Sequence, residues 1–294
     1  MAALTLTVTQ SLAGRTVKSL LRGELGLSNT CIGRLKRTET GLTVNGSRVF
    51  INAVLRTGDV LVADLDSTEQ STVVDPIPMD LDICYEDAHL LILNKPAPLA
   101  VIPSSLAPDE PTLANGLRAY LGESFAFHPV NRLDRGTTGL MAVAKSGHVH
   151  HQLQQALHTG GFFRQYLAVT VGAPPQPEGW VHLPIGRATG SAVARQVCPH
   201  GQEAHTHYRI LARRGPFALV ELTPHTGRTH QLRVHMAALG CPLAGDWLYG
   251  AEDRALIPRP ALHAARISLI HPITGEQLQR TAPLPADMKT ILEF

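Results

Sequence analysis

The chain has 294 residues, enough for one large domain or for a large domain and a small one. Hydrophobic residues make up 44% and charged residues 17%, which is the balance of an ordinary globular protein. The net charge is only +2, so any binding of a nucleic acid must depend on local basic patches.

The cysteines and the apolar runs limit the classes of protein further. The four cysteines are far apart and form no Cys-x-x-Cys pair, which argues against a zinc ribbon or a redox pair and favours a reducing cytosol. The first residues have no basic head and no long apolar core, so we expect no signal peptide. No run approaches the roughly 18 apolar residues of a membrane span. We therefore expect a cytoplasmic protein.

Local signals near the N-terminus predict a short series of elements. The Asn45-Gly46 pair predicts the tight turn of a hairpin, and Ser28 is a good N-cap. In chain order we expect a strand over residues 4–8, a helix over 16–22, a second helix after Ser28, a hairpin over 41–49 and a strand over 60–63.

Positive charge is concentrated in the same region. Residues 15–56 contain eight Lys or Arg against Glu24 and Glu39, a local excess of six. A solvated helix face is the usual explanation of such a charge run, and an electrostatic footprint for a polyanion is the alternative. Residues 64–80, polar at first and then proline-containing, are the expected interdomain linker.

One carboxylate dominates the middle of the chain. Asp134 stands between Arg132 and Arg135 in residues 128–139, and an apolar run typical of a buried strand follows at 140–144. Opposite charge within a few ångströms keeps a carboxylate ionised. Gly and Thr residues allow a tight loop that presents the carboxylate. Asp134 is therefore either a nucleophile or base, or a structural carboxylate paired to arginine in a turn.

The remaining segments alternate between strands and helices. Histidines 148, 150 and 151 lack the spacing and the carboxylate partner of a metal site, so we interpret them as part of a solvated helix face. His205 and His207 are given no role. The expected elements are two strands over 83–95, helices over 112–121 and 147–160, a strand over 162–172, a hairpin over 186–202, strands over 204–210 and from 219, a helix from about 229 to 239, and a strand from 262.

The segment Arg132-Leu-Asp-Arg-Gly-Thr-Thr-Gly139 resembles the signature loop of the RluA-type pseudouridine synthases, which isomerise uridine in structured RNA. Further blocks, from about residue 80 to 286, are also similar to this family. The resemblance implies that Asp134 is the catalytic residue, that Tyr166 is the active-site tyrosine and that Arg233 pairs with the aspartate. The family usually has His at the position of Asn131, and often Lys at the position of Arg164. The Asn131 substitution leaves the support of the loop open.

The same resemblance implies roles for residues that bind RNA. Arg132 would fill the stack vacated by an extruded base. Arg228 and His230 would lie near the entrance, and Lys95, in Asn-Lys-Pro, would approach a phosphate. The order of elements in residues 1–70 is similar to the alpha-L RNA-binding domain of a small-subunit ribosomal protein. That likeness implies phosphate contacts by Arg34, Lys36 and Arg37.

These patterns together predict an RNA pseudouridine synthase without a cofactor or metal. We expect an α+β fold: a small N-terminal RNA-binding domain (1–70), a linker (71–80) and a catalytic domain (81–294) built on a mixed, mainly antiparallel sheet. Ribosomal RNA of the large subunit is favoured over transfer RNA as the substrate, and a monomer is expected. A catalytically silent RNA-binding protein and a hydrolase using Asp134 with a histidine are the alternatives. The first would be favoured by loss of Asp134, Tyr166 or Arg233, and the second lacks a Ser or Cys elbow.

Overall fold

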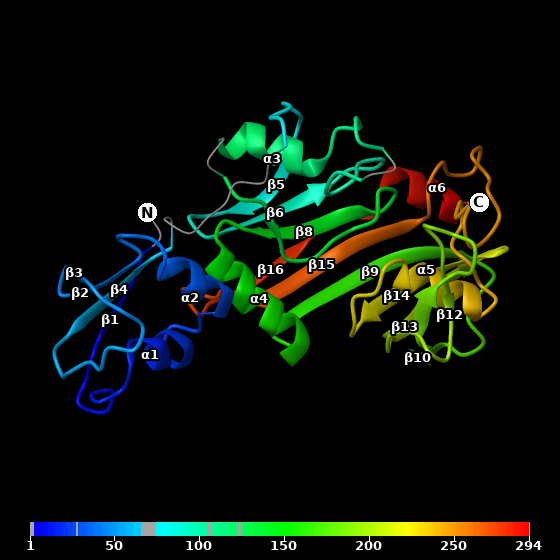
Figure 1. Ribbon diagram of the computed structural model, residues 1–294. Helices are drawn as coiled ribbons and strands as arrows, with labels where there is room; N and C mark the ends of the chain where they lie inside the picture. Colours follow the sequence, from blue (N-terminus) through cyan, green and yellow to red (C-terminus); the bar gives the residue numbers. More distant parts are fainter. Residues whose placement is uncertain (1–2, 28, 66–73, 105–106, 123–124, 294) are drawn as a thin grey trace.

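A computed structural model describes residues 3–27, 29–65, 74–104, 107–122 and 125–293. The N-terminal segment has its own four-stranded sheet, in the order β1-β4-β2-β3, which lies at one end of the molecule in Figure 1. Its elements are β1 (Ala3–Thr7), α1 (Val17–Gly23), α2 (Asn29–Leu35), β2 (Leu42–Val44), β3 (Ser47–Arg48) and β4 (Val60–Asp64).

The short N-terminal elements form where local signals predict them. The side chain of Thr16 accepts a hydrogen bond from the Ser19 amide and caps α1. Asn45 and Gly46, with φ of 50° and 80°, form the turn between β2 and β3. Leucines and valines of both helices and the sheet make a separate core, which includes Val17, Leu20 and Leu61. The predicted cap at Ser28 and residues 66–73 of the predicted linker lie outside the described residues.

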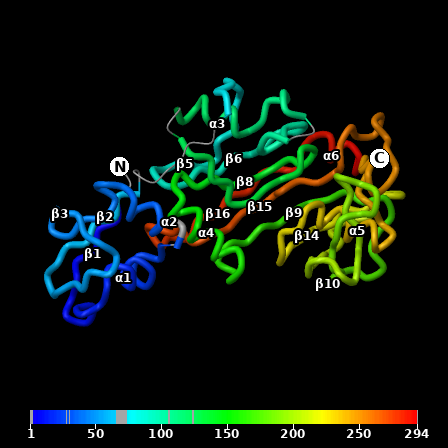
Figure 2. Tube along the Cα trace, viewed as in Figure 1, coloured from blue at the N-terminus to red at the C-terminus, as the bar shows by residue number. Residues whose placement is uncertain are grey.

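The rest of the chain is organised around a ten-stranded sheet that runs through the molecule (Figures 1 and 2). Its main path is β10-β13-β14-β9-β15-β8-β6-β5, with β16 added to β15 and β7 added to β8. The β15–β8 pair is parallel, and the other pairs described are antiparallel, as the predicted mixed sheet requires. Its strands are β5 (Asp82–Glu86), β6 (Leu90–Lys95), β7 (His128–Pro129), β8 (Thr138–Ala144), β9 (Phe162–Val171), β10 (Glu178–His182), β13 (His205–Arg214), β14 (Phe217–Pro224), β15 (Leu262–Ile270) and β16 (Gln277–Thr281).

Helices cover both faces of this sheet, because the apolar residues of β6 and β8 alternate between two cores. Leu91 and Met141 face one core, which contains residues of α3 (Leu113–Leu121). Leu90 and Leu140 face the other, which contains residues of α4 (Gly147–Thr159). A small hairpin of β11 (Ile185–Arg187) and β12 (Arg195–Val197), together with α5 (Gln231–Ala238) and α6 (Ala286–Glu293), completes the fold. None of the helices in the described residues is long and apolar enough to cross a membrane.

Helix α4 corrects one interpretation of the sequence. Gly160, in the left-handed conformation, follows the last residue of the helix, as the predicted range of 147–160 requires. Ser146, which was not predicted as a cap, caps the first turn. His148, however, is 4% exposed and packs inward, so the interpretation of all three histidines as a solvated face is wrong for this residue. Burial lowers the pKa of His148 to about 4, and the charges of His151 and His89 act in the same direction.

Strand register brings three distant segments together. Gly139 pairs with Ala264 of β15, and Ala264 pairs on its other side with Tyr166 of β9. Gly139 has a φ of 110°, and a Cβ at this position would collide with the backbone of Ala264. A glycine is therefore required where β8 leaves the preceding loop and enters the parallel pair. Only β15 therefore separates the start of β8, which follows the loop of Asp134, from β9, which contains Tyr166.

Candidate active site

The loop of residues 128–139, here called the Asp loop, is fixed to β8 by Asn131. Val130 donates its amide hydrogen to the carbonyl of Ala142, at 2.9 Å. Oδ1 of Asn131 accepts from the Ala142 amide at 2.9 Å, and its Nδ2 donates to the Leu140 carbonyl at 3.5 Å. The buried amide side chain therefore continues the strand pairing in place of backbone atoms, and this is how Asn131 supports the loop.

Buried cations hold the other side of the Asp loop through its carbonyl oxygens. Nζ of Lys95 donates to the carbonyls of Pro96 and Leu99, each at 2.8 Å, and to that of Arg135 at 3.4 Å. Nη1 of Arg259 donates to the Gly136 carbonyl at 3.4 Å. These contacts fix the backbone on the C-terminal side of Asp134.

The expected contact of Lys95 with an RNA phosphate is wrong for this structure. The residue is 1% exposed, and its ammonium group is already bonded to three carbonyl oxygens. Burial lowers the pKa of Lys95 to about 7, and the charge of Asp134 acts against this shift. Three acceptors match the three hydrogens of an ammonium group, so the geometry suits the charged form.

Arg233, in the first turns of α5, joins two carboxylates. Its Nε and Nη2 donate to the two oxygens of Asp246, each at 2.8 Å, and its Nη1 donates to Oδ2 of Asp134 at 3.3 Å. Arg233 is 5% exposed and Asp246 is fully buried. Burial acts to lower the pKa of Arg233, but the hydrogen bonds and charge of Asp246, with the charge of Asp134, raise it overall.

The predicted pair of Arg233 and Asp134 is therefore present. The two arginines next to Asp134 in the sequence, however, are not its charge partners. Arg135 pairs with Glu110 through two bonds of 2.9 Å, and Arg132 is exposed. Neither forms an ion pair with Asp134 among the described residues. The charge partner of the carboxylate comes from a residue 99 positions later in the chain.

His230 approaches the same carboxylate from the start of α5. Its Nε2 lies 3.9 Å from Oδ2 of Asp134, too far for a hydrogen bond. Its Nδ1 lies 2.7 Å from the hydroxyl of Tyr249, which accepts from the Arg195 amide at 2.8 Å. The hydroxyl can donate its own hydrogen to Nδ1, and in that arrangement the ring hydrogen of His230 lies on Nε2, toward Asp134. Burial lowers the pKa of His230, against the charge of Asp134, and favours this neutral form.

The backbone at His230 is strained. Its φ of 57° and ψ of 17° are in the left-handed region, which residues other than glycine seldom adopt. Buried Gln231 stabilises the turn before it, because its Oε1 accepts from the Arg228 amide and the Thr226 hydroxyl. Its Nε2 donates to the His205 carbonyl, which ties the turn to β13.

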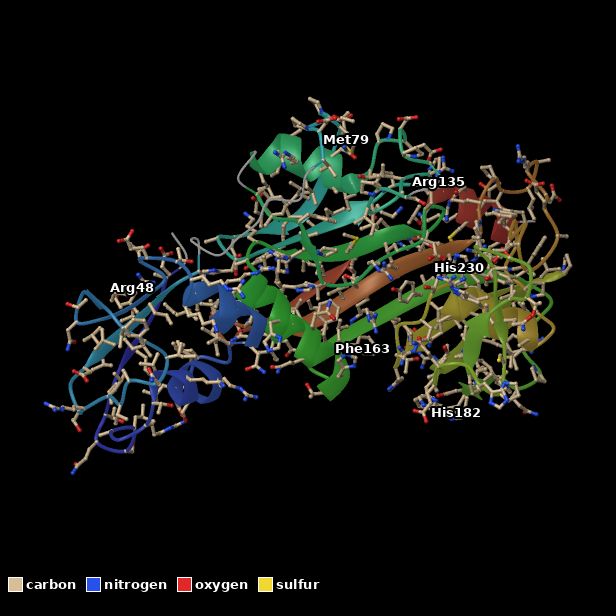
Figure 3. The ribbon with its side chains drawn as sticks, viewed as in Figure 1. Arg48, Met79, Arg135, Phe163, His182 and His230 are labelled. Atoms are coloured by element: carbon tan, nitrogen blue, oxygen red, sulfur yellow. The ribbon has the colours of Figure 1, made fainter. Side chains whose placement is uncertain are left out.

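Tyr166 lies at the base of the same pocket, on β9. It is 6% exposed, and burial raises the pKa of its hydroxyl, with the charge of Arg164 acting against this shift. The pocket has a volume of about 510 Å³. Arg135, from the Asp loop, and His230, just before α5, both line it, and Figure 3 labels both near the end of the sheet where α5 and α6 lie.

Most of the predicted site residues are brought together. The pocket is lined by Asp134, Tyr166 and Arg233, and by three predicted RNA-contacting residues: Arg132, Arg228 and His230. Lys95 lies beneath the loop, outside the lining. Arg34, Lys36 and Arg37 are exposed in and after α2, in the N-terminal sheet unit.

Sequence reasoning missed the residues that hold this lining in place. Asp246 follows Gly245, whose φ of 68° and close approach to the backbone of Arg259 require a glycine. A carboxylate directly after such a glycine was the only signal in the sequence that pointed to Asp246. Tyr249 supports both His230 and the guanidinium of Arg233, which lies 4.9 Å from its ring centroid. Nothing in the spacing pointed to Tyr249. The described residues contain no cluster of three His, Cys, Asp or Glu that could hold a metal.

Comparison with known proteins defines the class of enzyme to which this sheet and pocket belong. A family model described as RNA pseudouridylate synthase matches residues 89–238. The uncharacterized RNA pseudouridine synthase YjbO of Bacillus subtilis is 41% identical over 274 residues, which are 92% of this chain and 96% of the relative. The ribosomal large subunit pseudouridine synthase D of Yersinia pestis is 37% identical over 270 residues, covering 86% and 82%.

A solved structure agrees with these matches. The human RNA pseudouridylate synthase domain containing 4 superposes with a TM-score of 0.55 at 30% identity, covering 72% of this chain and 91% of that one. The protein is thus an RNA-modifying isomerase. It belongs to the RluA-type RNA pseudouridine synthase family, as the sequence motifs predicted.

Proposed function

We propose that this enzyme converts uridines of large-subunit ribosomal RNA to pseudouridine, with Asp134 as the catalytic carboxylate. The observation that carries the proposal is the position of Asp134. It is 30% exposed in a 510 Å³ pocket, and among the described residues Arg233 bonds only its Oδ2. Oδ1 is left available to a substrate. An ionised carboxylate that is fixed at one oxygen is suited to act as nucleophile or base.

The reaction exchanges one bond of the base for another. The bond from ribose to N1 breaks, the uracil turns in the pocket, and a bond from ribose to C5 forms. The C5 hydrogen leaves as a proton and N1 carries a hydrogen in the product, so no electrons are exchanged. Asp134 starts the sequence, and Tyr166 stacks on the base and assists removal of the C5 proton. Arg233 and Asp246 keep the carboxylate in place throughout.

Three further pocket residues complete the proposal. A uridine in folded RNA must be extruded before it can enter the pocket. Exposed Arg132, beside Asp134, is placed to fill the vacated stack. Arg228 and His230 contact the incoming nucleotide at the entrance. Nε of Arg228 is bonded to the Glu203 carbonyl at 2.9 Å, which orients its guanidinium.

We also propose that residues 1–70 are an alpha-L type RNA-binding domain, with a linker at 71–80 and a catalytic domain at 81–294. The separate sheet and core of the N-terminal segment support this division. Arg34, Lys36 and Arg37 are exposed and form no ion pair among the described residues, so they are available to phosphates. Ribosomal RNA as the substrate is supported by the named function of the Yersinia relative.

The catalytic proposal is tested by Asp134→Asn, which removes one charge at near-constant volume. The assay is release of tritium from RNA labelled at C5 of uridine, since replacement at C5 frees the label. We expect turnover to fall by at least about 1,000-fold, within the range of losses seen when a catalytic-triad member is removed. Asp109→Asn, an exposed carboxylate outside the pocket, is the matched control. Turnover of Asp134→Asn within tenfold of the parent enzyme would overturn the assignment.

The substrate proposal needs a separate experiment. Pseudouridines are mapped in ribosomal and transfer RNA from a strain that lacks the enzyme and from the same strain complemented with the parent or with Asp134→Asn. We expect sites in large-subunit ribosomal RNA to vanish and to return only with the parent enzyme. Loss confined to transfer RNA would reject ribosomal RNA as the substrate and leave the role of Asp134 standing.

A further inference from the structure

An exposed tryptophan and four histidines gather at the edge of the large sheet, beside the pocket described above. We call this group the Trp180 platform: Trp180, His182, His205, His207 and His225. Trp180 is 49% exposed, although its neighbours in β10 and β13 are well packed. Figure 3 places His182 at the outer edge of the molecule, beside β10. The mechanism uses none of these residues.

Strand register explains why the rings gather. Trp180 lies opposite His207 and His182 lies opposite His205 in the antiparallel β10–β13 pair. Alternate residues of a strand face the same side, so all four side chains lie on one face. Val181 and Thr206, on the other face, are buried in the core side of the sheet. The fifth member, His225, follows β14, and its amide donates to the His205 carbonyl at 2.9 Å.

The rings are already arranged as a stack. The rings of Trp180 and His182 are parallel to within 7°, with centroids 5.4 Å apart. Those of His207 and His225 lie 5.0 and 4.7 Å from the indole. Glu178 holds His207 at 3.0 Å, and Nδ1 of His182 lies 2.8 Å from Nδ1 of His205. These contacts fix the rings and reduce the entropy lost when a ligand stacks on the indole.

The platform is continuous with the catalytic pocket. His225 lines the pocket and also contacts Trp180, so it belongs to both surfaces. Arg164 lines the same side of the pocket, and its Nε is buried without a hydrogen-bond partner among the described residues. Burial lowers the pKa of His225, and the charges of His207, His205 and Arg164 act in the same direction. Arg164 therefore offers a cation to an anionic chain that extends from the pocket to the rings.

We propose that the Trp180 platform binds an unpaired nucleotide of the substrate RNA, adjacent to the extruded uridine, by stacking its base on the indole. Every base has a π-face that stacks on aromatic rings, and imidazole N–H groups donate to phosphates and base edges. No three of these histidines are arranged for a metal in the described residues. The inference rests on the proposed function in one respect, because the ligand is the RNA whose uridine occupies the pocket.

The test compares Trp180→Ala, Trp180→Phe and Tyr120→Ala in the full-length enzyme. Tyr120 is 54% exposed on α3, outside the pocket, and serves as the matched aromatic control. With an RNA that keeps unpaired nucleotides beside the target, Trp180→Ala should raise KM by about 5- to 160-fold, because base stacking contributes about 1–3 kcal/mol per base. Its kcat should change by no more than about twofold. Trp180→Phe should retain most of the affinity, and Tyr120→Ala should match the parent.

A second substrate, with these flanking nucleotides removed, separates stacking from a structural effect. The parent enzyme should lose affinity for it, and Trp180→Ala should lose nothing more. An unchanged KM on the long RNA, or an equal loss on both substrates, would overturn the proposal. A fall in kcat at constant KM, with a lowered thermal midpoint, would also overturn it and make Trp180 structural. If Asp134→Asn remains active while Trp180→Ala raises KM, the catalytic proposal fails and the platform stands.

Discussion

The cations of the N-terminal segment and the cations of the pocket differ in what holds them. Arg34, Lys36 and Arg37 are exposed, and none forms an ion pair in the part of the chain that the structure describes. Arg233 is 5% exposed and lies between two carboxylates, and Lys95 is bonded to three carbonyls. The first group can act only on something outside the protein. The second group has its charge satisfied within the fold and acts through geometry.

This difference sets the expected size of mutational effects. Surface charges that have no partner contribute little to stability, so their removal should change binding alone. Removing one member of a buried pair leaves the other charge uncompensated in a medium of low dielectric constant, which typically destabilises by about 3–5 kcal/mol. Substitution of the buried cation Arg233 should therefore change folding and chemistry together, and substitution of the exposed cations in the N-terminal segment should change neither.

Among the substitutions that compare these two groups of cations, Arg233→Met should have the largest effect. It removes the partner of Asp134 and leaves buried Asp246 without a cation, so the free energy of unfolding should fall by about 3–5 kcal/mol. Misplacement of the carboxylate should lower kcat by at least about 100-fold. Arg233→Lys keeps the charge but loses the planar fork that bonds both oxygens of Asp246, so its loss should be smaller. Urea unfolding and single-turnover tritium release measure the two quantities.

Arg228→Met is the control for that substitution, because Arg228 lines the pocket without contacting Asp134 among the described residues. Its replacement should raise KM much more than it lowers kcat. If Arg228→Met lowers kcat strongly while Arg233→Met leaves it normal, the arginine that pairs with Asp134 has been assigned wrongly.

Asp246→Asn should have the next largest effect and extends the comparison to a residue that touches no substrate. The amide keeps the shape but offers Arg233 one acceptor oxygen and no charge, so the guanidinium is less well fixed. We expect kcat to fall by about tenfold, which corresponds to about 1.4 kcal/mol of the barrier. Tritium release at saturating RNA measures it, and Asp253→Asn, outside the pocket lining, is the control. A normal kcat would show that Asp246 is not needed to position the pair.

The two regions also differ in how far the sequence could predict them. The N-terminal hairpin was predicted, because its Asn45-Gly46 turn signal lies within the residues that form it. The caps of α1 and α4, by Thr16 and Ser146, are also contacts between residues close in the chain, but neither cap was predicted. Strands β10 and β16 and helix α6 were not predicted, because their segments carry weaker local patterns and are stabilised by packing on distant strands.

The same limit applied within the site. The family motif gave Asp134, Tyr166 and Arg233, and the structure places them in one pocket. The burial of Lys95 could not be inferred, because its acceptor in the Asp loop, the carbonyl of Arg135, is 40 residues away. The Trp180 platform arises from the register of β10 on β13. The alternation of His205 and His207 places these two on one strand face, but nothing in the sequence pairs them with His182 and Trp180.

Replacing Arg34, Lys36 and Arg37 with Gln should have a smaller effect, confined to binding. Each lost phosphate contact should reduce the slope of log binding constant against log salt by about 0.7–0.9, so the slope should fall by roughly two to three in total. The thermal midpoint should not change, because all three side chains are exposed. Substituting Arg213, Arg214 and Lys289 with Gln removes the same charge elsewhere on the surface and is the matched control. An equal slope change in both triple variants would remove the specific role of the N-terminal segment.

The smallest effect should come from His148. Unlike the arginines and lysines above, this residue changes its charge within the pH range in which the protein is studied, so its substitution should change the pH dependence of stability. Burial lowers its pKa from 6.5 to about 4. Between these two values the unfolded chain binds a proton that the folded protein excludes, so stability falls as the pH is lowered from 6.5 toward 4. His263, also buried, has its pKa lowered to about 4 and contributes in the same direction. His148→Gln should therefore remove part of this pH dependence and leave activity at pH 7.5 unaltered. Urea unfolding midpoints at pH 7, 6 and 5 measure the slope, and His158→Gln, on the exposed side of the same helix, should keep that of the parent. If His148→Gln and His158→Gln flatten the curve equally, burial of His148 is not the source of its acid sensitivity.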